Sequence, residues 1–309
     1  MLAHRSEAGR MDHSISLPNC AQRWLLSAFA DEASQSCDEQ IAALCRAGIK
    51  RIDMRKIDGY NITQLPLDHA EVVANKLDAA GITVAYFGSP IGKIDITADF
   101  QGDLEKLDHL GRLSGMLGCK AVRIFSYFNE QAAGMAQWQQ VSLDRLRRLH
   151  DRAQQLGLVL VHENERHVFG DRCDQVRLIA DEMRDGQTFK LIFDFDNYHQ
   201  SGDNVWDNWL KLRDVTDAIH LKDSDGQGQH VPVGQGGGRV REILVDALKR
   251  GWSGPLSLEP HLKHSDAVAL TGPHGQPNES FARMSTEQCF LAAAEAAIAL
   301  LGDIQAPVG

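Results

Sequence analysis

The segment LVLVHENE, residues 158–165, joins four apolar residues directly to four polar ones. An apolar run without alternation is typical of a strand that is buried on both faces, as in a parallel sheet. Burying carboxylates is unfavourable unless cations or hydrogen bonds compensate them. Glu163 and Glu165, at the end of such a strand, therefore indicate a functional polar site.

Three later segments repeat this pattern of an apolar strand that ends in potential metal ligands. They are KLIFDFD (190–196, with Asp194 and Asp196), AIHLKD (218–223, with His220) and PLSLEPH (255–261, with Glu259). Glu163, Asp194, His220 and Glu259 are separated by 31, 26 and 39 residues. Each step corresponds to about one strand and one helix in an eight-unit barrel of roughly 250 residues. We expect the four side chains to form one site, because parallel strands end at the same face.

Eight strands alternate with helices along the chain. The predicted strands are residues 23–30, 50–57, 83–89, 121–126, 158–165, 189–196, 217–223 and 255–260, and the predicted helices are 38–47, 68–80, 100–117, 138–156, 176–183, 205–215, 240–250 and 286–301. This alternation predicts the α/β class and a single (β/α)8 TIM barrel. A doubly wound open sheet is the alternative, but no GxGxxG motif follows the first strand.

The domain organisation is predicted to be simple. Residues 21–309 are expected to form one barrel domain, and residues 1–20 a flexible N-terminal extension without the apolar core of a secretory signal. Two long loops, 224–239 and 264–282, are candidates for a mobile lid over the active-site face.

Composition excludes several classes of partner. A net charge of −10 disfavours nucleic acid, and the absence of an 18-residue apolar run disfavours a membrane span. The six cysteines form no CxxC pair, which is typical of free thiols in a reducing cytoplasm. A small-molecule substrate is therefore expected. The oligomeric state stays open, with a homo-oligomer as one alternative.

The set of two glutamates, one aspartate and one histidine is rich in oxygen ligands. It suits Mn²⁺ or Mg²⁺ best, with Co²⁺ or Zn²⁺ as alternatives. The competing interpretation is that each residue caps a helix or forms a salt bridge at the barrel rim. Strand alternation puts Glu163 and Glu165 on one face, and likewise Asp194 and Asp196, so the residues alone do not decide which acid of each pair binds metal.

Six short motifs occur in a fixed order from about residue 23 to residue 301. They are SAFADE (27–32), GSPIGK (88–93), HENE with a following GD (162–165 and 170–171), FDFDN (193–197), HLKD (220–223) and SLEPHL (257–262). In these motifs the chain resembles the sugar phosphate isomerase/epimerase family, which are xylose isomerase-like TIM barrels. It departs from the family at FDFDN, where FDPAN is usual. The resemblance implies that Glu163, Asp194, His220 and Glu259 bind the divalent metal.

The resemblance also implies a reaction. Members of this family isomerise or epimerise sugars by removing a proton next to a carbonyl, which gives an enediolate. For this chain, the resemblance implies a small carbohydrate as substrate and Glu163 and Glu259 as the acid–base pair. Because metal binding lowers the basicity of a carboxylate, Glu165 stays a candidate for the base.

Three alternative functions use the same fold. The nearest is a lyase or dehydratase that eliminates from a keto-sugar or 3-keto-glycoside at the same site. A phosphodiesterase similar to endonuclease IV would require more histidines and a basic groove. A non-catalytic sugar-binding barrel would not require four intact ligands.

Five further residues are candidates for substrate binding: Lys222, Arg123, Asn197, Lys93 and His261. Lys222 follows His220 on the same strand face and could hold an oxyanion, or it could form a salt bridge to Asp194 or Asp223. Arg123 lies within an apolar strand, where it could compensate Glu163 or bind substrate. No P-loop is present, so the family name gives no reason to expect a phosphorylated substrate.

Overall fold

The computed structural model describes residues 24–263 and 278–304 and contains the closed barrel that the alternation predicts. In order around the barrel, the strands are β1 (Leu25–Ala28), β10 (Pro255–Leu258), β9 (Ala218–Leu221), β8 (Phe189–Asp194), β7 (Val159–Glu163), β6 (Ala121–Ile124), β5 (Thr83–Phe87) and β2 (Arg51–Met54). All neighbouring barrel strands pair in parallel, so the open-sheet alternative is wrong. The expected extension 1–20 and residues 264–277 of the second loop lie outside the described residues.

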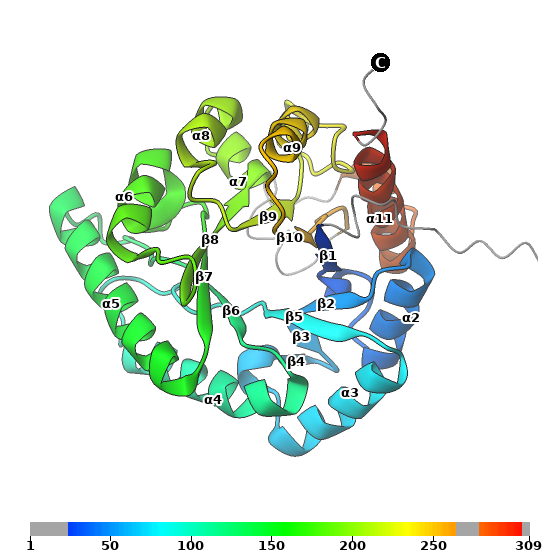
Figure 1. Ribbon diagram of the computed structural model, residues 1–309, viewed down its shortest axis with the longest axis horizontal. Coiled ribbons are helices and arrows are strands. Elements are labelled where there is room, and N and C mark those ends of the chain that lie inside the picture. Colours follow the sequence, from blue (N-terminus) through cyan, green and yellow to red (C-terminus); the bar gives the residue numbers. More distant parts are fainter. Residues whose placement is uncertain (1–23, 264–277, 305–309) are drawn as a thin grey trace, which may run out of the picture.

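Helices surround the barrel on its outer side (Figure 1). They are α2 (Cys37–Ala47), α3 (Leu67–Ala79), α4 (Gln101–Leu117), α5 (Met135–Leu156), α6 (Cys173–Met183), α7 (Phe195–Gln200), α8 (Val205–Leu212), α9 (Val240–Lys249) and α11 (Thr286–Asp303). Except for α7, each matches a helix predicted from the sequence to within a few residues. Among the described residues, no helix combines the length and the apolar character needed to cross a bilayer.

Gly157 shows how a helix is ended and the chain returned to the barrel. It has a φ of 68° and lies directly after α5, where its N–H group points to the carbonyl oxygens of Ala153 and Gln154. Left-handed backbone at a helix end favours glycine because other residues have a Cβ that crowds this conformation. The chain then enters β7, the strand that carries Glu163.

Two separate apolar cores show which side chains face inward. Val161 packs with Tyr86, Ile192 and Ala218, which come from strands around the barrel, so this small cluster lies inside it. Leu160 belongs to the large core between barrel and helices. Since side chains alternate along a strand, Glu163 faces the interior with Val161.

His162 faces the opposite way from Glu163. Its Nε2 lies 2.9 Å from the Ser126 hydroxyl, and burial lowers its pKa to about 4 despite the nearby Glu163. His162 is therefore a buried neutral imidazole on the outer side of the barrel.

The prediction of one strand over residues 50–57 is wrong at its end. β2 stops at Met54, and β3 (Lys56–Ile57) pairs with β4 (Tyr60–Asn61) in an antiparallel hairpin. Asp58 and Gly59, the two residues of the turn, both have positive φ, at 48° and 83°. An Asp-Gly pair with this geometry favours a tight two-residue hairpin, so the chain folds back.

The predicted strand 189–196 is also too long. β8 ends at Asp194, whose carboxylate accepts a hydrogen bond of 2.8 Å from the Asn197 N–H and caps α7. The predicted fifth strand likewise ends at Glu163 rather than Glu165. Strand alternation therefore does not relate Glu163 to Glu165 or Asp194 to Asp196.

The glycine-rich segment 224–239, predicted as a mobile lid, is held by Asp223. The Asp223 carboxylate accepts hydrogen bonds of 3.0, 2.9 and 2.9 Å from the N–H groups of Gly234, Gly236 and Gly238. Gly236 allows this close approach, because a Cβ there would lie 2.3 Å from the Ser224 carbonyl oxygen. In this conformation the segment is anchored to Asp223 at three glycines.

Candidate metal centre

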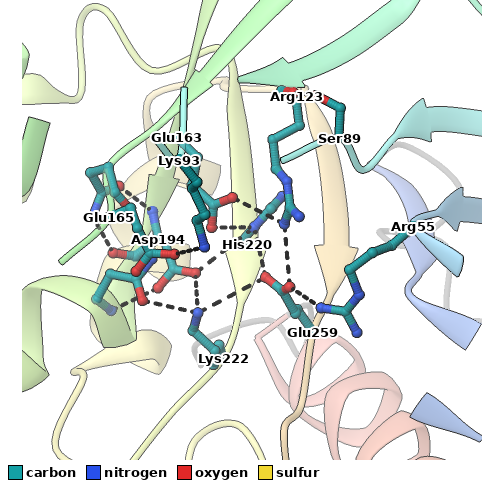
Figure 2. A network of polar contacts seen from close by, with 12 residues as sticks. Arg55, Ser89, Lys93, Arg123, Glu163, Glu165, Asp194, His220, Lys222 and Glu259 are labelled. Carbon is teal, nitrogen blue, oxygen red and sulfur yellow. Dashed lines mark hydrogen bonds and ion pairs between the residues drawn. The ribbon is translucent and has the colours of Figure 1, made fainter. Parts of the chain in front are cut away.

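The four potential ligands converge at the carboxyl-terminal ends of successive strands (Figure 2). Glu163 ends β7, Asp194 ends β8, His220 lies near the end of β9, and Glu259 follows β10. Each offers one ligand atom that lies within 4.8 Å of the other three, and all four residues are buried. The structure therefore brings together four residues that are spread over nearly one hundred positions of the sequence, from Glu163 to Glu259.

His220 lies at the centre of this group. Its Nδ1 is 2.9 Å from Glu163 Oε1, 3.3 Å from Glu259 Oε2 and 3.8 Å from Asp194 Oδ2. Burial alone would lower the pKa of His220, but attraction to Glu163 and hydrogen bonds to both glutamates outweigh burial and raise it to about 10. In the absence of a metal ion, the imidazolium thus supplies positive charge where three carboxylates meet, and it must release a proton to bind a metal.

The three carboxylates differ in how they are compensated. Burial acts to raise every pKa, yet His220 and Arg123 lower that of Glu163 to about 2. For Glu259, Lys222 and Arg123 overcome burial and hold the pKa well below its usual value. For Asp194, burial prevails over Lys222 and raises the pKa to about 8.

The donor set fits a divalent cation. Two buried carboxylate oxygens, Glu163 Oε2 and Asp194 Oδ2, accept no well-directed hydrogen bond, although cations lie about 3 Å away. Three carboxylates and one imidazole are ligands that suit Mn²⁺ or Mg²⁺ and are compatible with Co²⁺ or Zn²⁺. An ion held here would compensate Asp194, whose pKa stays raised despite the nearby Lys222.

Two buried guanidinium groups support Glu259. Arg123 Nη1 lies 3.1 Å from Glu163 Oε2 and 3.2 Å from Glu259 Oε1, and Arg55 Nη1 lies 2.8 Å from the same Glu259 oxygen. Both guanidiniums approach the Phe29 ring, at 4.9 and 5.0 Å from its centroid. Arg55 also pairs with Asp31 at 2.7 Å. The structure agrees with the expectation that Arg123 compensates Glu163.

Lys222 and Asn197 adjoin the centre on the side of Asp194. Lys222 Nζ lies 3.0 Å from both Asp194 Oδ2 and Asn197 Oδ1, and 3.9 Å from Glu259. Asn197 in turn donates to the Asn164 carbonyl oxygen at 2.8 Å. Of the two salt bridges considered for Lys222, the one to Asp194 is present.

Lys93 and Glu165 form an ion pair beside the centre. Lys93 Nζ lies 2.6 Å from Glu165 Oε2 and 4.2 Å from the centroid of the Phe125 ring. Burial raises the pKa of Glu165, but Lys93 and Lys222 more than offset this and lower it. Glu165 is therefore ionised and within the site, but outside the group of four potential ligands.

His261 and Glu32 extend the polar network beyond Glu259. His261 Nδ1 lies 2.8 Å from Glu32 Oε1, and the backbone N–H of His261 donates to Glu32 Oε2. The His261 Nε2 is 3.8 Å from Glu259. Glu32, Glu259 and His261 form a second group with ligand atoms close enough for an ion, but Arg55 already compensates both glutamates. His199, by contrast, takes no part in this network. Its Nδ1 lies 2.9 Å from the Ser224 hydroxyl.

Several residues of the site could not be selected from the sequence. Arg55, Asp31 and Glu32 approach Glu259 only because closure of the barrel puts β1 between β10 and β2. SAFADE, which contains Asp31 and Glu32, was the one available signal. Asp196, the departure from the family motif, lies 3.2 Å from His230 instead of joining the four ligands.

Comparisons with known proteins agree with this architecture. The zinc-containing IOLI protein superimposes with a TM-score of 0.68 at 16% identity, over 90% of this chain and 98% of that one. A D-psicose 3-epimerase solved in the presence of D-fructose gives 0.66 at 14% identity, with coverages of 90% and 99%. The probable 3-DHS dehydratase AsbF from Bacillus anthracis gives 0.65 at 16%, with coverages of 89% and 98%.

At these identities the solved structures establish the fold alone. No curated protein matches the sequence closely enough to count as a relative. The sequence pattern of one family, described as xylose isomerase-like TIM barrel, matches residues 41–284, which is most of the barrel. The chain therefore belongs to the xylose isomerase-like TIM barrel family.

Proposed function

We propose that this protein is a divalent-metal-dependent isomerase or epimerase that removes a proton next to the carbonyl group of a small sugar. The observation that carries the proposal is the convergence of Glu163, Asp194, His220 and Glu259, with ligand atoms within 4.8 Å of one another. A divalent ion held by these residues would act as a Lewis acid on the oxygen atoms of the substrate. The epimerase among the similar structures supports this class of reaction.

The two glutamates are the proposed acid–base pair. Their carboxylates lie on either side of His220 Nδ1, at 2.9 and 3.3 Å, and cationic neighbours hold both ionised. An ionised carboxylate can accept the α-proton, and the carboxyl group that results can return it. We assign removal of the proton to Glu163, because Glu259 has two guanidinium partners and is the weaker base.

Other side chains are proposed to hold the substrate. Lys222 has its ammonium 3.0 Å from Asp194 and could bind a substrate oxygen beside the metal ligands. Arg123, Asn197, Lys93 and His261 line the same network and remain candidates for contacts to hydroxyl groups. The five described cysteines form no disulfide, which supports the proposed cytoplasmic location.

Exchange of substrate hydrogen with solvent tests this proposal. Wild-type protein supplied with Mn²⁺ should incorporate deuterium from D₂O next to the carbonyl of ketohexoses or 3-keto-sugars, as NMR would detect. Glu163→Gln should reduce exchange by about 10²–10⁴-fold, the usual contribution of an acid–base group. Glu71→Gln, on the exposed face of α3, is the matched control and should exchange normally.

The products separate the proposal from its nearest rival. Exchange followed by a rearranged or epimerised sugar supports an isomerase or epimerase, whereas loss of a leaving group indicates a lyase. Full exchange in Glu163→Gln would contradict the role of Glu163. If Glu165→Gln alone abolished exchange, Glu165 would be the base.

A further inference from the structure

A second cavity lies at the amino-terminal end of the barrel, opposite the metal centre. Its volume is about 630 Å³, and its lining includes the first residues of several strands, namely Leu25 of β1, Arg51 of β2 and Ala121 of β6. The potential metal ligands occupy the other ends of strands in the same barrel. The two sites therefore lie at opposite ends of the barrel.

The sequence explains why this end of the barrel is hollow. Inward-facing positions alternate along the strands, giving Val159, Val161 and Glu163 on β7 and Lys190, Ile192 and Asp194 on β8. Bulky branched side chains usually fill every inner layer of such a barrel. Here the lining at this end includes the small side chains of Ala121 and Pro255, which leave space.

The middle layer separates this cavity from the metal centre. Tyr86 and Val161 line the cavity and also belong to the apolar cluster that they form with Ile192 and Ala218. The cavity thus has an apolar floor inside the barrel. It differs from the metal centre in both position and character.

The charged residues that line the cavity all have the same sign. Its lining contains Arg51, Lys120 and Lys190 and no acidic residue, although the chain carries a net charge of −10. Among the residues that the structure describes, none of these three side chains has an ion-pair or hydrogen-bond partner. Arg184, at the same end of the barrel, instead pairs with Asp217 at 2.7 Å. The three cations therefore remain available to a ligand.

We propose that this cavity binds a small molecule with an apolar body and an anionic head, either a carboxylate or a phosphate. Its volume lies within the usual range of about 300–1,000 Å³ for ligand pockets. The body would contact Val84, Tyr86 and Val161, and the head would bind Arg51 and Lys190 by charge-assisted hydrogen bonds. This binding site is independent of the reaction proposed for the metal centre.

Titration calorimetry on the full chain with decanoate and with decyl phosphate tests the proposal. We expect saturable binding of at least one anion, at one molecule per chain. Lys190→Gln should weaken it about tenfold, as expected for loss of one charge-assisted hydrogen bond. Lys249→Gln removes an equal charge from an exposed position at the end of α9 and should leave the affinity unchanged. Decanol, which lacks the charge, should bind more weakly.

A second variant fills the cavity without removing a charge. Gly115 lies in α4 on the cavity wall, and a Cβ at this position would have no atom within 4 Å. Gly115→Leu also improves helix propensity, so the fold should be retained, as thermal unfolding would check. It should abolish binding. Failure of both anions to bind wild-type protein, or equal affinities in wild type, Lys190→Gln and Gly115→Leu, would overturn the proposal.

Discussion

Arg123 is the residue that joins the two glutamates of the candidate metal centre. Its Nη1 contacts Glu163 at 3.1 Å and Glu259 at 3.2 Å, and the side chain is only 7% exposed. Removing one partner from a buried ionic group leaves charge without compensation. The stability of the metal-free barrel should therefore depend strongly on this one guanidinium.

Arg123→Met should lower the free energy of unfolding of metal-free protein by about 3–5 kcal/mol, as for other broken buried ion pairs. Urea denaturation in the presence of a chelator would measure it. Arg147→Met is the matched control, because Arg147 pairs with Asp144 and Glu182 on the surface of α5, and such pairs contribute about 1 kcal/mol or less. Equal losses in the two variants would show that Arg123 is not required for compensation.

Asp53 is a buried acid inside the barrel, and its pKa is raised, whereas that of Glu163 is lowered. Burial raises its pKa from 3.8 to about 6, although Ser27 donates a hydrogen bond of 2.7 Å to its carboxylate. Below pH 3.8 the group is protonated in both folded and unfolded states. As the pH rises from 3.8 to 6, the unfolded state releases its proton first, so ionisation of Asp53 progressively destabilises the fold.

Asp53→Asn removes this titration. Relative to wild type, the variant should gain about 2.5 kcal/mol in unfolding free energy between pH 4 and pH 8, which is most of the shift of about two pKa units expressed as energy. Urea unfolding of both proteins at the two pH values measures this difference. The same difference between variant and wild type at both pH values would contradict the raised pKa.

The sequence pattern locates the polar site, and the family resemblance selects one acid of each pair, but neither identifies most of the groups that compensate these acids. Glu163, Asp194, His220 and Glu259 share a pattern, because each ends an apolar strand. Arg55 has no such pattern, since it follows β2 just before a polar hairpin. Glu32 and His261 are 229 positions apart, and only the pairing of β1 with β10 makes them neighbours.

At the scale of single elements, Asp223 organises the loop that follows β9. Asp223 Oδ2 accepts from Gly234 and Gly236, while Oδ1 accepts from Gly238 and Ser224. Both oxygens are therefore required as acceptors. Burial raises the pKa of Asp223, and these backbone donors act against that rise.

Asp223→Asn should release this loop, because either orientation of the amide directs an NH₂ group at two N–H donors. Hydrogen exchange at Gly234, Gly236 and Gly238 should become faster, and mass spectrometry would detect it. Asp225→Asn is a control within the same loop, since one oxygen of Asp225 accepts from both Gln227 and Gln229, and an amide oxygen can replace it. Unchanged exchange in Asp223→Asn would refute the anchoring role.

Elements with strong periodicity were predictable, and their local endings were less so. The apolar spacing of α4 and α5 located these helices to within about three residues. The ends of β2 and β8 were misplaced, because the Asp58–Gly59 turn and the Asp194 cap are decided by single residues. An apolar run indicates a strand, but it does not show where a following polar residue begins a turn or a helix.

At the scale of the whole molecule, the barrel has a different polar environment at each end. Acids paired with cations gather at the carboxyl ends of the strands, while the cavity at the amino ends is lined by three cations that have no partner among the described residues. An apolar layer with Tyr86 and Val161 separates them. The strand–helix count predicted the barrel, but this difference depends on which residues share a layer, and strand register determines that.

Metal content tests the central claim of this account most directly. After incubation with Mn²⁺ and removal of free ion, wild-type protein should retain about one equivalent per chain, as measured by elemental analysis. Glu259→Gln and Asp194→Asn should lose the ion, and Glu71→Gln should retain it. A wild-type protein that retains no divalent metal, or a Glu259→Gln variant that retains as much as wild type, would contradict the assignment of these four residues as a metal centre.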